Sequence, residues 1–238
     1  MIVCLDSGNS RIKWGVHDGQ HWLAQGAVAH AEVAQLAALV DHWPTPGKVL
    51  LANVAGAEAG QRIRQQLAAW QSVFDEVKAE AQRCGVTNLY KNPAQLGVDR
   101  WCALVGARAQ TSSACLVVMA GTATTIDTLD AQGHFLGGLI LPGLGLMHRA
   151  LARDTAGLPF ANGHFTSQPR CTDDAIVSGA IEAQAGAIER AFARLAVADA
   201  SCLLSGGNAA RLAEHLNIPC QVLENLPLQG LRQLASEV

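Results

Sequence analysis

A glycine-centred segment near the N-terminus has residue types that suit phosphate binding. Gly8 lets the backbone approach an anion closely, Lys13 adds a positive charge, and neighbouring hydroxyl and amide side chains offer hydrogen bonds. The candidate segment consists of Asp6, Ser7, Gly8, Asn9, Ser10, Arg11, Ile12 and Lys13. Asp6 would repel a phosphate unless a cation lay between them, and Mg²⁺ accompanying ATP is the natural cation. The alternative is an ordinary hairpin turn, for which Asp and Asn are common residues.

A second segment repeats this pattern near the middle of the chain. The stretch LVVMAGTATTIDTLDAQG resembles VCLDSGNSRIKWGVHDG, and Gly121 with Thr122 again offers a close backbone approach and a hydroxyl. Two similar hairpins half a chain apart indicate a duplicated domain with a binding site between the copies. Asp127, in the returning strand, either approaches the metal or is a solvent-facing carboxylate.

Strand and helix patterns alternate around these segments. Apolar and alternating runs predict strands at 2–5, 11–16, 22–27, 48–51, 115–119, 124–129, 137–141, 203–204 and 220–223. Helical spacing predicts helices at 31–40, 57–70, 144–151, 172–196, 209–216 and 227–235. We therefore expect an α/β protein with an N-terminal domain at 1–112 and a C-terminal domain at 113–238.

Composition excludes several other classes of protein. The 238 residues are half hydrophobic with 5% aromatic residues, and 17 basic residues against 20 acidic ones form no basic cluster, so nucleic acid is not an expected partner. No apolar run is long enough to span a membrane. The seven cysteines are scattered without a C-x-x-C pair, and we expect buried, reduced thiols in a cytoplasmic protein. The histidines lack ligand spacing, and His17, His21 and His30 are expected at the surface.

Four motifs in order resemble those of the type III pantothenate kinases and the Bvg accessory factor proteins grouped with them. They are D-S-G-N-S-x-x-K at 6–13, G-V-D-R-W at 97–101, A-G-T-A-T-T-I-D at 120–127 and T-D-D-A-I-V-S-G at 172–179. The resemblance implies the duplicated acetate and sugar kinase/Hsp70/actin (ribonuclease H-like) fold, with two domains around a nucleotide cleft. It also implies a homodimer that uses ATP and Mg²⁺ to phosphorylate pantothenate to 4′-phosphopantothenate, the first step of coenzyme A biosynthesis.

The resemblance also assigns residues. Residues 6–13 would bind the ATP phosphates, Asp6 would hold the metal, and Gly121 and Thr122 would contact the phosphates from the second domain. Asp99 would be the general base, because phosphoryl transfer needs a carboxylate within reach of the substrate hydroxyl. The implied pantothenate contacts are Tyr90, Gly97, Val98, Asp99, Arg100 and Thr172.

Plainer interpretations of these residues stay open. Asp99 also suits the first turn of a helix, and Thr172 suits the N-cap of the long helix that follows it. Arg100 could pair with an anionic substrate group, with a neighbouring carboxylate or with a dimer partner. Tyr90, the single tyrosine, could be half-buried packing.

Met119 departs from the family pattern. Many members have an aspartate there that helps to bind K⁺ or NH₄⁺, and a thioether is not a ligand for a hard cation. The monovalent cation site is therefore unassigned. Two rival functions remain alongside the kinase: an ATP-binding regulatory accessory protein of the same fold without pantothenate turnover, and a phosphatase-type hydrolase whose hairpins position water.

Overall fold

The computed structural model describes residues 1–237, which divide into two compact units. Unit 1 contains Met1–Ser112, Gly133–Phe135 and the described residues from Asn225 onward, and unit 2 contains Ser113–Gln132 and Leu136–Glu224. The units are discontinuous in sequence because the C-terminal helix packs within unit 1. The domain bounds 1–112 and 113–238 stay a prediction.

Unit 1 is built on a five-stranded sheet in the order β3-β2-β1-β4-β5. Its strands are β1 (Ile2–Ser7), β2 (Arg11–His17), β3 (Trp22–Ala29), β4 (Lys48–Asn53) and β5 (Phe74–Glu76). The first three are antiparallel neighbours, whereas β4 pairs parallel with both β1 and β5. The internal strand β4 is a nearly continuous apolar run, as expected of a strand covered on both faces.

Short helices cover one face of this sheet. They are η1 (His30–Leu36), α1 (Ala37–His42), α2 (Ala57–Gln66) and η2 (Ala68–Val73). The predicted helices at 31–40 and 57–70 each contain a 3₁₀ segment, with non-helical backbone at Glu32 and Trp70. Apolar side chains from these helices join those of β1 and β2 in one core, so the sheet gives the first hairpin a rigid base.

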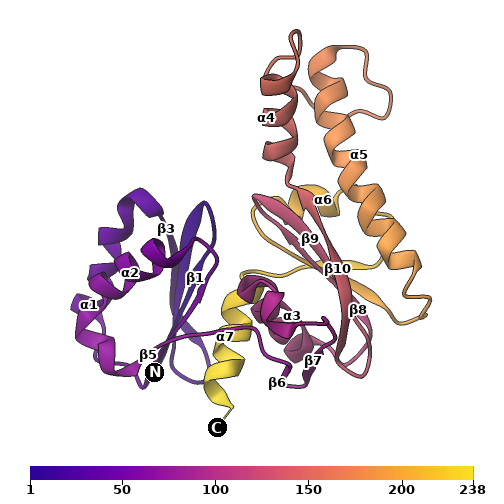
Figure 1. The fold of residues 1–238 in the computed structure, drawn as a ribbon. Coiled ribbons are helices and arrows are strands. Elements are labelled where there is room, and N and C mark those ends of the chain that lie inside the picture. The colour runs from indigo at the N-terminus through magenta and orange to yellow at the C-terminus, as the bar shows by residue number, and fades with distance from the viewer. Residues whose placement is uncertain (238) are drawn as a thin grey trace. The chain divides into compact units, whose positions relative to one another are not determined.

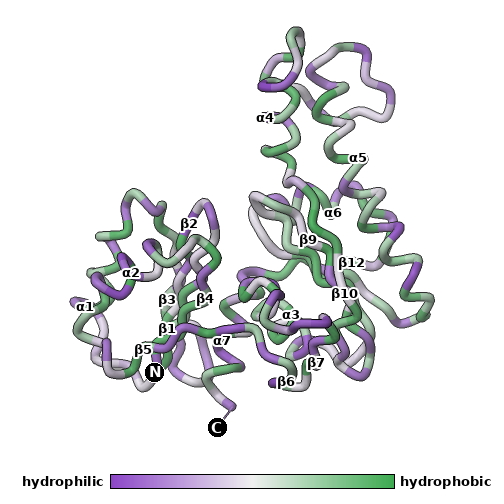
Figure 2. Tube along the Cα trace, viewed as in Figure 1, coloured by the Kyte–Doolittle hydropathy of each residue, from purple (hydrophilic) through white to green (hydrophobic). Residues whose placement is uncertain are grey.

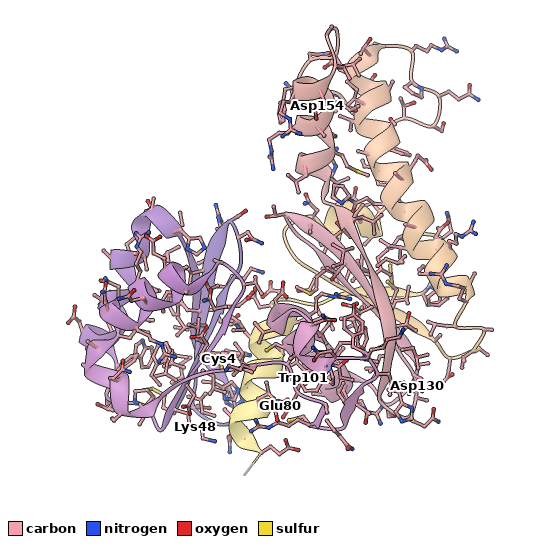
Figure 3. All side chains as sticks on the ribbon, in the orientation of Figure 1. Cys4, Lys48, Glu80, Trp101, Asp130 and Asp154 are labelled. Carbon is pink, nitrogen blue, oxygen red and sulfur yellow. The ribbon has the colours of Figure 1, made fainter. Side chains whose placement is uncertain are left out.

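The other face of the sheet is covered by two closely packed helices, α3 (Val98–Gln110) and α7 (Leu226–Ser236). A Cβ atom on Gly230 would lie 1.8 Å from the Cys102 carbonyl oxygen, and one on Gly106 would lie 2.4 Å from that of Leu226. Only glycine allows this approach. Lys48, labelled in Figure 3 near α7, donates from Nζ to the Ala235 carbonyl oxygen at 3.1 Å, at the negative end of the helix dipole.

Unit 1 also has a small hairpin of β6 (Gln82–Arg83) and β7 (Val86–Asn88), followed by η3 (Pro93–Gln95). β7 pairs parallel with His134 and Phe135, the first residues of β10. Sequence patterns did not indicate β5, β6 or β7, because two or three residues are too few to show an alternation.

Unit 2 repeats the strand order of unit 1. Its strands are β8 (Cys115–Ala120), β9 (Ala123–Leu129), β10 (His134–Pro142), β11 (Ser201–Ser205) and β12 (Cys220–Val222), in the order β10-β9-β8-β11-β12. β8 is antiparallel to β9 and parallel to β11, which is parallel to β12, matching the arrangement around β1. This common topology bears out the duplication inferred from the two hairpins.

The helices of unit 2 are α4 (Leu144–Asp154), α5 (Thr172–Ala193) and α6 (Ala209–Ala213). In Figure 1, α4 and α5 extend side by side beyond the sheet, and the tube of Figure 2 is largely hydrophobic along β8 and β10. α5 and α6 pack on one face of the sheet, where Val118, Ile126 and Ile188 are buried.

Several expectations about individual residues are wrong. Cys171 and Cys220 are exposed, because one lies just before α5 and the other on the edge strand β12; no disulfide bond joins any of the seven cysteines, all of which lie within the described residues. His17 is buried, because its position in β2 points inward: its Nδ1 accepts a hydrogen bond from the Gly19 N–H at 2.9 Å, and its ring contacts Trp22 edge to face. Over residues 1–237, no helix is both long and apolar enough to cross a membrane.

Candidate functional site: two hairpins and the start of helix α3

The first hairpin closes with a hydrogen bond from the Gly8 N–H to the Arg11 carbonyl oxygen at 3.1 Å. Gly8 does not have a positive φ, and a Cβ atom there would meet nothing closer than 3.6 Å. The turn itself therefore does not require glycine. Asn9, Ser10 and Arg11 are exposed, so the tip of the hairpin is open to a ligand.

Asp6 is the most unusual group in this hairpin. Its side chain is 7% exposed, and Oδ1 is buried without a hydrogen-bond partner. Burial raises the pKa of Asp6 to about 6, opposed by the charge of Lys13 and reinforced by that of Asp99. Lys13 lies directly opposite Asp6 across the β1–β2 pair, on the same face of the sheet. A buried, unpartnered carboxylate is costly unless a ligand compensates it.

Ser7 and Ile12 point to the opposite face from Asp6, because side chains alternate along a strand. Ile12 belongs to the apolar core of unit 1. Ser7 is fully buried, and its Oγ has no hydrogen-bond partner. If these two residues bind a ligand on the Asp6 side, they must therefore use backbone groups.

Asp99 lies in the first turn of α3, which begins after Gly97. Its Oδ1 accepts a hydrogen bond from the Arg100 N–H at 2.8 Å, and a Cβ atom on Gly97 would lie 2.7 Å from that oxygen. Gly97 thus leaves room for the carboxylate. Cys102, one turn further along α3, is buried; its pKa is raised well above the usual value by burial and then by the charges of Asp6 and Asp99. Both carboxylates therefore act on the same small region of unit 1.

Arg100, Tyr90 and Phe135 form a cluster beside this region. Arg100 is buried and donates from a guanidinium nitrogen to the Tyr90 hydroxyl at 3.2 Å. Its guanidinium carbon lies 5.8 Å from the Tyr90 ring centre and 5.7 Å from that of Phe135, and the two rings are 5.1 Å apart. Tyr90 is half-buried, and its ring and hydroxyl hold the cation in place. A cation held in this way suits a carboxylate ligand.

The second hairpin exposes Gly121, Thr122 and Ala123 at its tip. The Gly121 N–H donates to the Ala123 carbonyl oxygen at 3.0 Å, and the Gly143 N–H donates to that of Thr122 at 3.0 Å. The turn is one residue shorter than the first, since Ala120 pairs with Thr124 whereas Ser7 pairs with Ile12.

Other predicted positions in unit 2 differ from expectation. Asp127 is fully buried, so the solvent-facing interpretation is wrong; Thr125 and Leu129, on the same side of β9, are buried as well. Thr172 is the first residue of α5, and Cys171 precedes it without a side-chain cap bond, so the N-cap interpretation is also wrong. Thr172 lies about 18 Å along α5 from Gln184, which contacts the second hairpin. Within unit 2, Thr172 therefore lies far from the second hairpin.

Two side chains that contact the hairpins, His30 and Gln184, had no signal in residue spacing. His30 lies 2.7 Å from the Gly8 carbonyl oxygen through Nε2, and the Arg62 guanidinium donates to the His30 carbonyl oxygen at 3.1 Å. Gln184 bonds Thr124 just after the second hairpin. The one sequence feature that could have drawn attention to Gln184 is that it is a polar residue within the apolar face of α5.

The residues of the first hairpin fit a magnesium ion carried by a polyphosphate. Among residues 1–237, no group of three or more histidine, cysteine or acidic side chains could hold a metal ion. Mg²⁺ does not need such a group, because it keeps several waters and binds through one or two carboxylates together with substrate phosphates. The buried Asp6 Oδ1, which lacks a partner, is a suitable single protein ligand.

Comparisons with known proteins agree with these features. A family model described as type III pantothenate kinase matches residues 2–194. A type III pantothenate kinase of Dechloromonas aromatica is 69% identical over 235 residues, covering 99% of each chain.

Solved structures that resemble the chain show the fold alone, because their sequence identities are low. A Campylobacter jejuni structure described as Baf family has a TM-score of 0.65 at 19% identity, covering 98% of this chain and 96% of that one. The activator of 2-hydroxyisocaproyl-CoA dehydratase from Clostridium difficile, solved with bound ADPNP, has a TM-score of 0.54 at 13% identity, covering 98% and 91%. The expected acetate and sugar kinase/Hsp70/actin fold is confirmed.

Proposed function

Because the chain belongs to the type III pantothenate kinase family, we propose that it transfers the terminal phosphoryl group of ATP to pantothenate, giving 4′-phosphopantothenate. The observation that best supports this chemistry is the buried Asp6 carboxylate, which lacks a partner and lies opposite Lys13 and within electrostatic range of Asp99. A cationic group, a candidate metal ligand and a candidate base are thus close together in unit 1.

The first hairpin would bind the phosphates through its exposed tip. The exposed tip residues Asn9, Ser10 and Arg11 would approach the polyphosphate, and Lys13 would neutralise part of its charge. Gly121 and Thr122 would contact the phosphates from the second hairpin, which needs both hairpins to face one nucleotide. When bound, Mg²⁺ would neutralise charge on the phosphate oxygens, and Asp6 would hold it.

Asp99 would orient the substrate hydroxyl and accept its proton. The carboxylate lies in the first turn of α3, and the Arg100 N–H donates a hydrogen bond that fixes one of its oxygens. The second oxygen can then face the hydroxyl. The hydroxyl oxygen attacks the terminal phosphorus as its proton passes to Asp99, and the bond to the bridging oxygen of ADP breaks.

Arg100 would bind the pantothenate carboxylate. Its guanidinium is buried and held by Tyr90, and a planar guanidinium matches a carboxylate with two parallel hydrogen bonds. Gly97 and Val98 would line the same pocket through their backbone, as the family resemblance implies. This assignment places both ends of the substrate on the first turn of α3.

A homodimer would explain Thr172, which lies remote from the second hairpin within its own unit. Thr172 is exposed, and it borders an apolar groove of about 620 Å³ between α4 and α5, lined also by Met147, Leu151 and Ile176. The exposed β10 side chains Leu139 and Ile140 add further apolar surface. Such surfaces mark interaction sites.

The regulatory alternative has weaker support. The Campylobacter jejuni structure described as Baf family shares only 19% identity, whereas the 69% identical relative is described as a kinase. The monovalent cation stays unassigned because of Met119, so activity should be compared in Na⁺, K⁺ and NH₄⁺.

A coupled assay of ADP release with and without pantothenate tests the proposal. We expect pantothenate and Mg²⁺ to stimulate release, and Asp99→Asn to lower kcat by about 100-fold or more while ATP still raises the melting temperature. Asp41→Asn is the matched control, because Asp41 is an exposed carboxylate of α1 outside the site. ATP binding without pantothenate-dependent turnover would favour the regulator, ADP release independent of pantothenate would favour a hydrolase, and full turnover by Asp99→Asn would exclude this base.

A further inference from the structure

Gln184 is a fully buried amide in the middle of the apolar face of α5. It lies between Ile181 and Ile188, which belong to the core of unit 2, and its side chain has no exposed surface. Burying an amide is costly unless its polar atoms are hydrogen-bonded. We therefore expect the buried amide of Gln184 to form hydrogen bonds with specific partners.

Those partners come from two different strands. The Thr124 hydroxyl donates to Gln184 Oε1 at 2.6 Å, and Gln184 Nε2 donates to the Pro142 carbonyl oxygen at 2.8 Å. Nε2 also contacts the Met147 sulfur at 3.8 Å. A carbonyl oxygen can only accept, so the amide nitrogen must face Pro142 and the oxygen must face Thr124. The amide therefore has one orientation.

Each strand position is next to a part of the second hairpin. Thr124 is the first buried residue after the exposed tip at 121–123, and Pro142 precedes Gly143. The Gly143 N–H bonds the Thr122 carbonyl oxygen, and a Cβ atom on Gly143 would lie 2.2 Å from the Gly121 carbonyl oxygen. The two strands thus meet directly beneath the tip, and Gln184 joins them there.

We propose that Gln184, acting through Thr124 and Pro142, is a positioning residue that fixes the second hairpin for ATP phosphate binding. This role rests on the proposed contact of Gly121 and Thr122 with the phosphates. Gln184 itself touches no substrate. Its loss should loosen the tip and weaken ATP binding. Pantothenate binding should be unaffected, because Asp99 and Arg100 lie in unit 1 and Thr172 lies about 18 Å along α5 from Gln184.

The test uses Thr124→Val and Gln184→Met, which preserve size and remove hydrogen bonds. We expect each to raise KM for ATP about tenfold, with KM for pantothenate within about twofold of wild type. Thr124→Ser, which retains the hydroxyl, should restore KM for ATP. Thr128→Val is the matched control, because Thr128 lies on the same face of β9 and has no side-chain bond to α5 among the described residues.

Three results would overturn the proposal: an unchanged KM for ATP in both folded variants, equal weakening of both substrates, or no rescue by Thr124→Ser. If Gln184→Met does not fold, Thr124→Val decides, since it leaves the bond from Gln184 to Pro142 intact. If the wild-type protein shows no pantothenate turnover, the proposed function fails separately. The rise in melting temperature with ATP then decides: a reduced rise in Thr124→Val that Thr124→Ser restores supports the positioning role, and an equal rise in all variants overturns it.

Discussion

At the scale of single residues, Asp6 shows a conflict between stability and function. A buried charged oxygen without a hydrogen-bond partner lowers the stability of the folded protein. Such destabilising groups are typical of functional sites, where the charge binds a ligand. The pKa of Asp6 in the folded protein is about 6, so above this pH the folded protein must bury the ionised carboxylate. The ligand-free protein is therefore less stable at neutral pH than it would be with a neutral residue at this position.

We expect Asp6→Asn to stabilise the protein at pH 8 without nucleotide by about 1–3 kcal/mol and to lower turnover by about 100-fold or more. Thermal unfolding without ligand and the ADP-release assay measure the two effects. Asp18→Asn is the contrasting control: Asp18 is exposed and accepts the Gln20 and His21 N–H groups at 2.7 Å, so its replacement should not stabilise. A destabilised Asp6→Asn protein would contradict this account.

Residue types alone indicated Asp6 and Lys13 as candidates for phosphate binding, and the family resemblance added Asp99 as the base. These three assignments stay predictions. The sequence was not sufficient to predict that Asp127 and His17 are buried, since strand alternation does not reveal which face of a strand is covered by distant segments. The partners of Gln184 and His30 depend on contacts across 60 and 22 residues.

At the scale of elements, the glycines of α3 and α7 decide how closely two helices pack. Because α3 begins with the Asp99 turn and α7 also contacts β1, which contains Asp6, this packing links both carboxylates to one framework. Helices that pack this closely through glycines cannot accept a methyl group at those positions without moving apart. Substitutions at the contact between α3 and α7 should therefore also affect the site.

Gly230→Ala should lower the free energy of unfolding by about 3 kcal/mol or more, because the new Cβ would lie 1.8 Å from the Cys102 carbonyl oxygen. Gly186→Ala in α5 is the matched control: a Cβ there meets nothing within 4 Å, so alanine should stabilise the helix by about 0.5–1 kcal/mol. Urea unfolding measures both. Similar effects of the two substitutions would show that the close packing of α3 and α7 does not limit stability.

The elements that the sequence predicted were the long periodic ones and the two hairpins. The hairpins were detectable because an apolar strand, a glycine turn and an alternating strand follow in close succession. The 3₁₀ segments in η1 and η2 were missed, because helical spacing over ten residues does not distinguish a continuous helix from one with an irregular turn.

At the scale of the whole molecule, the repeated strand order was predictable from two short similar segments, whereas the membership of α7 in unit 1 was not. Nothing in residues 226–236 indicates that they pack on α3 instead of on the strands that precede them. In the sequence α7 follows the second repeat, but in the structure it packs within unit 1. The free energy of unfolding of unit 1 therefore depends on a segment at the other end of the sequence.

The pH dependence of unfolding provides a test at this scale through His148. This residue is buried on α4, its Nε2 has no hydrogen-bond partner, and its ring contacts Phe160 edge to face. Burial, followed by the charge of Arg211, lowers the pKa of His148 from its ordinary value of 6.5. As pH falls below 6.5, the unfolded chain binds a proton before the folded one does, so stability present above 6.5 is progressively lost.

His148→Phe keeps an aromatic ring against Phe160 and removes the titrating group. As pH falls below 6.5, the free energy of unfolding of this variant should therefore decrease less steeply than that of the wild type. His17, whose pKa is also lowered by burial, should leave a residual slope. Arg211→Gln is the intermediate variant, because it removes the second cause of the shift and retains the first. Urea unfolding across this pH range, at low salt to limit screening, measures all three proteins. An unchanged slope in His148→Phe would mean that His148 binds its proton equally well in the folded and unfolded chains.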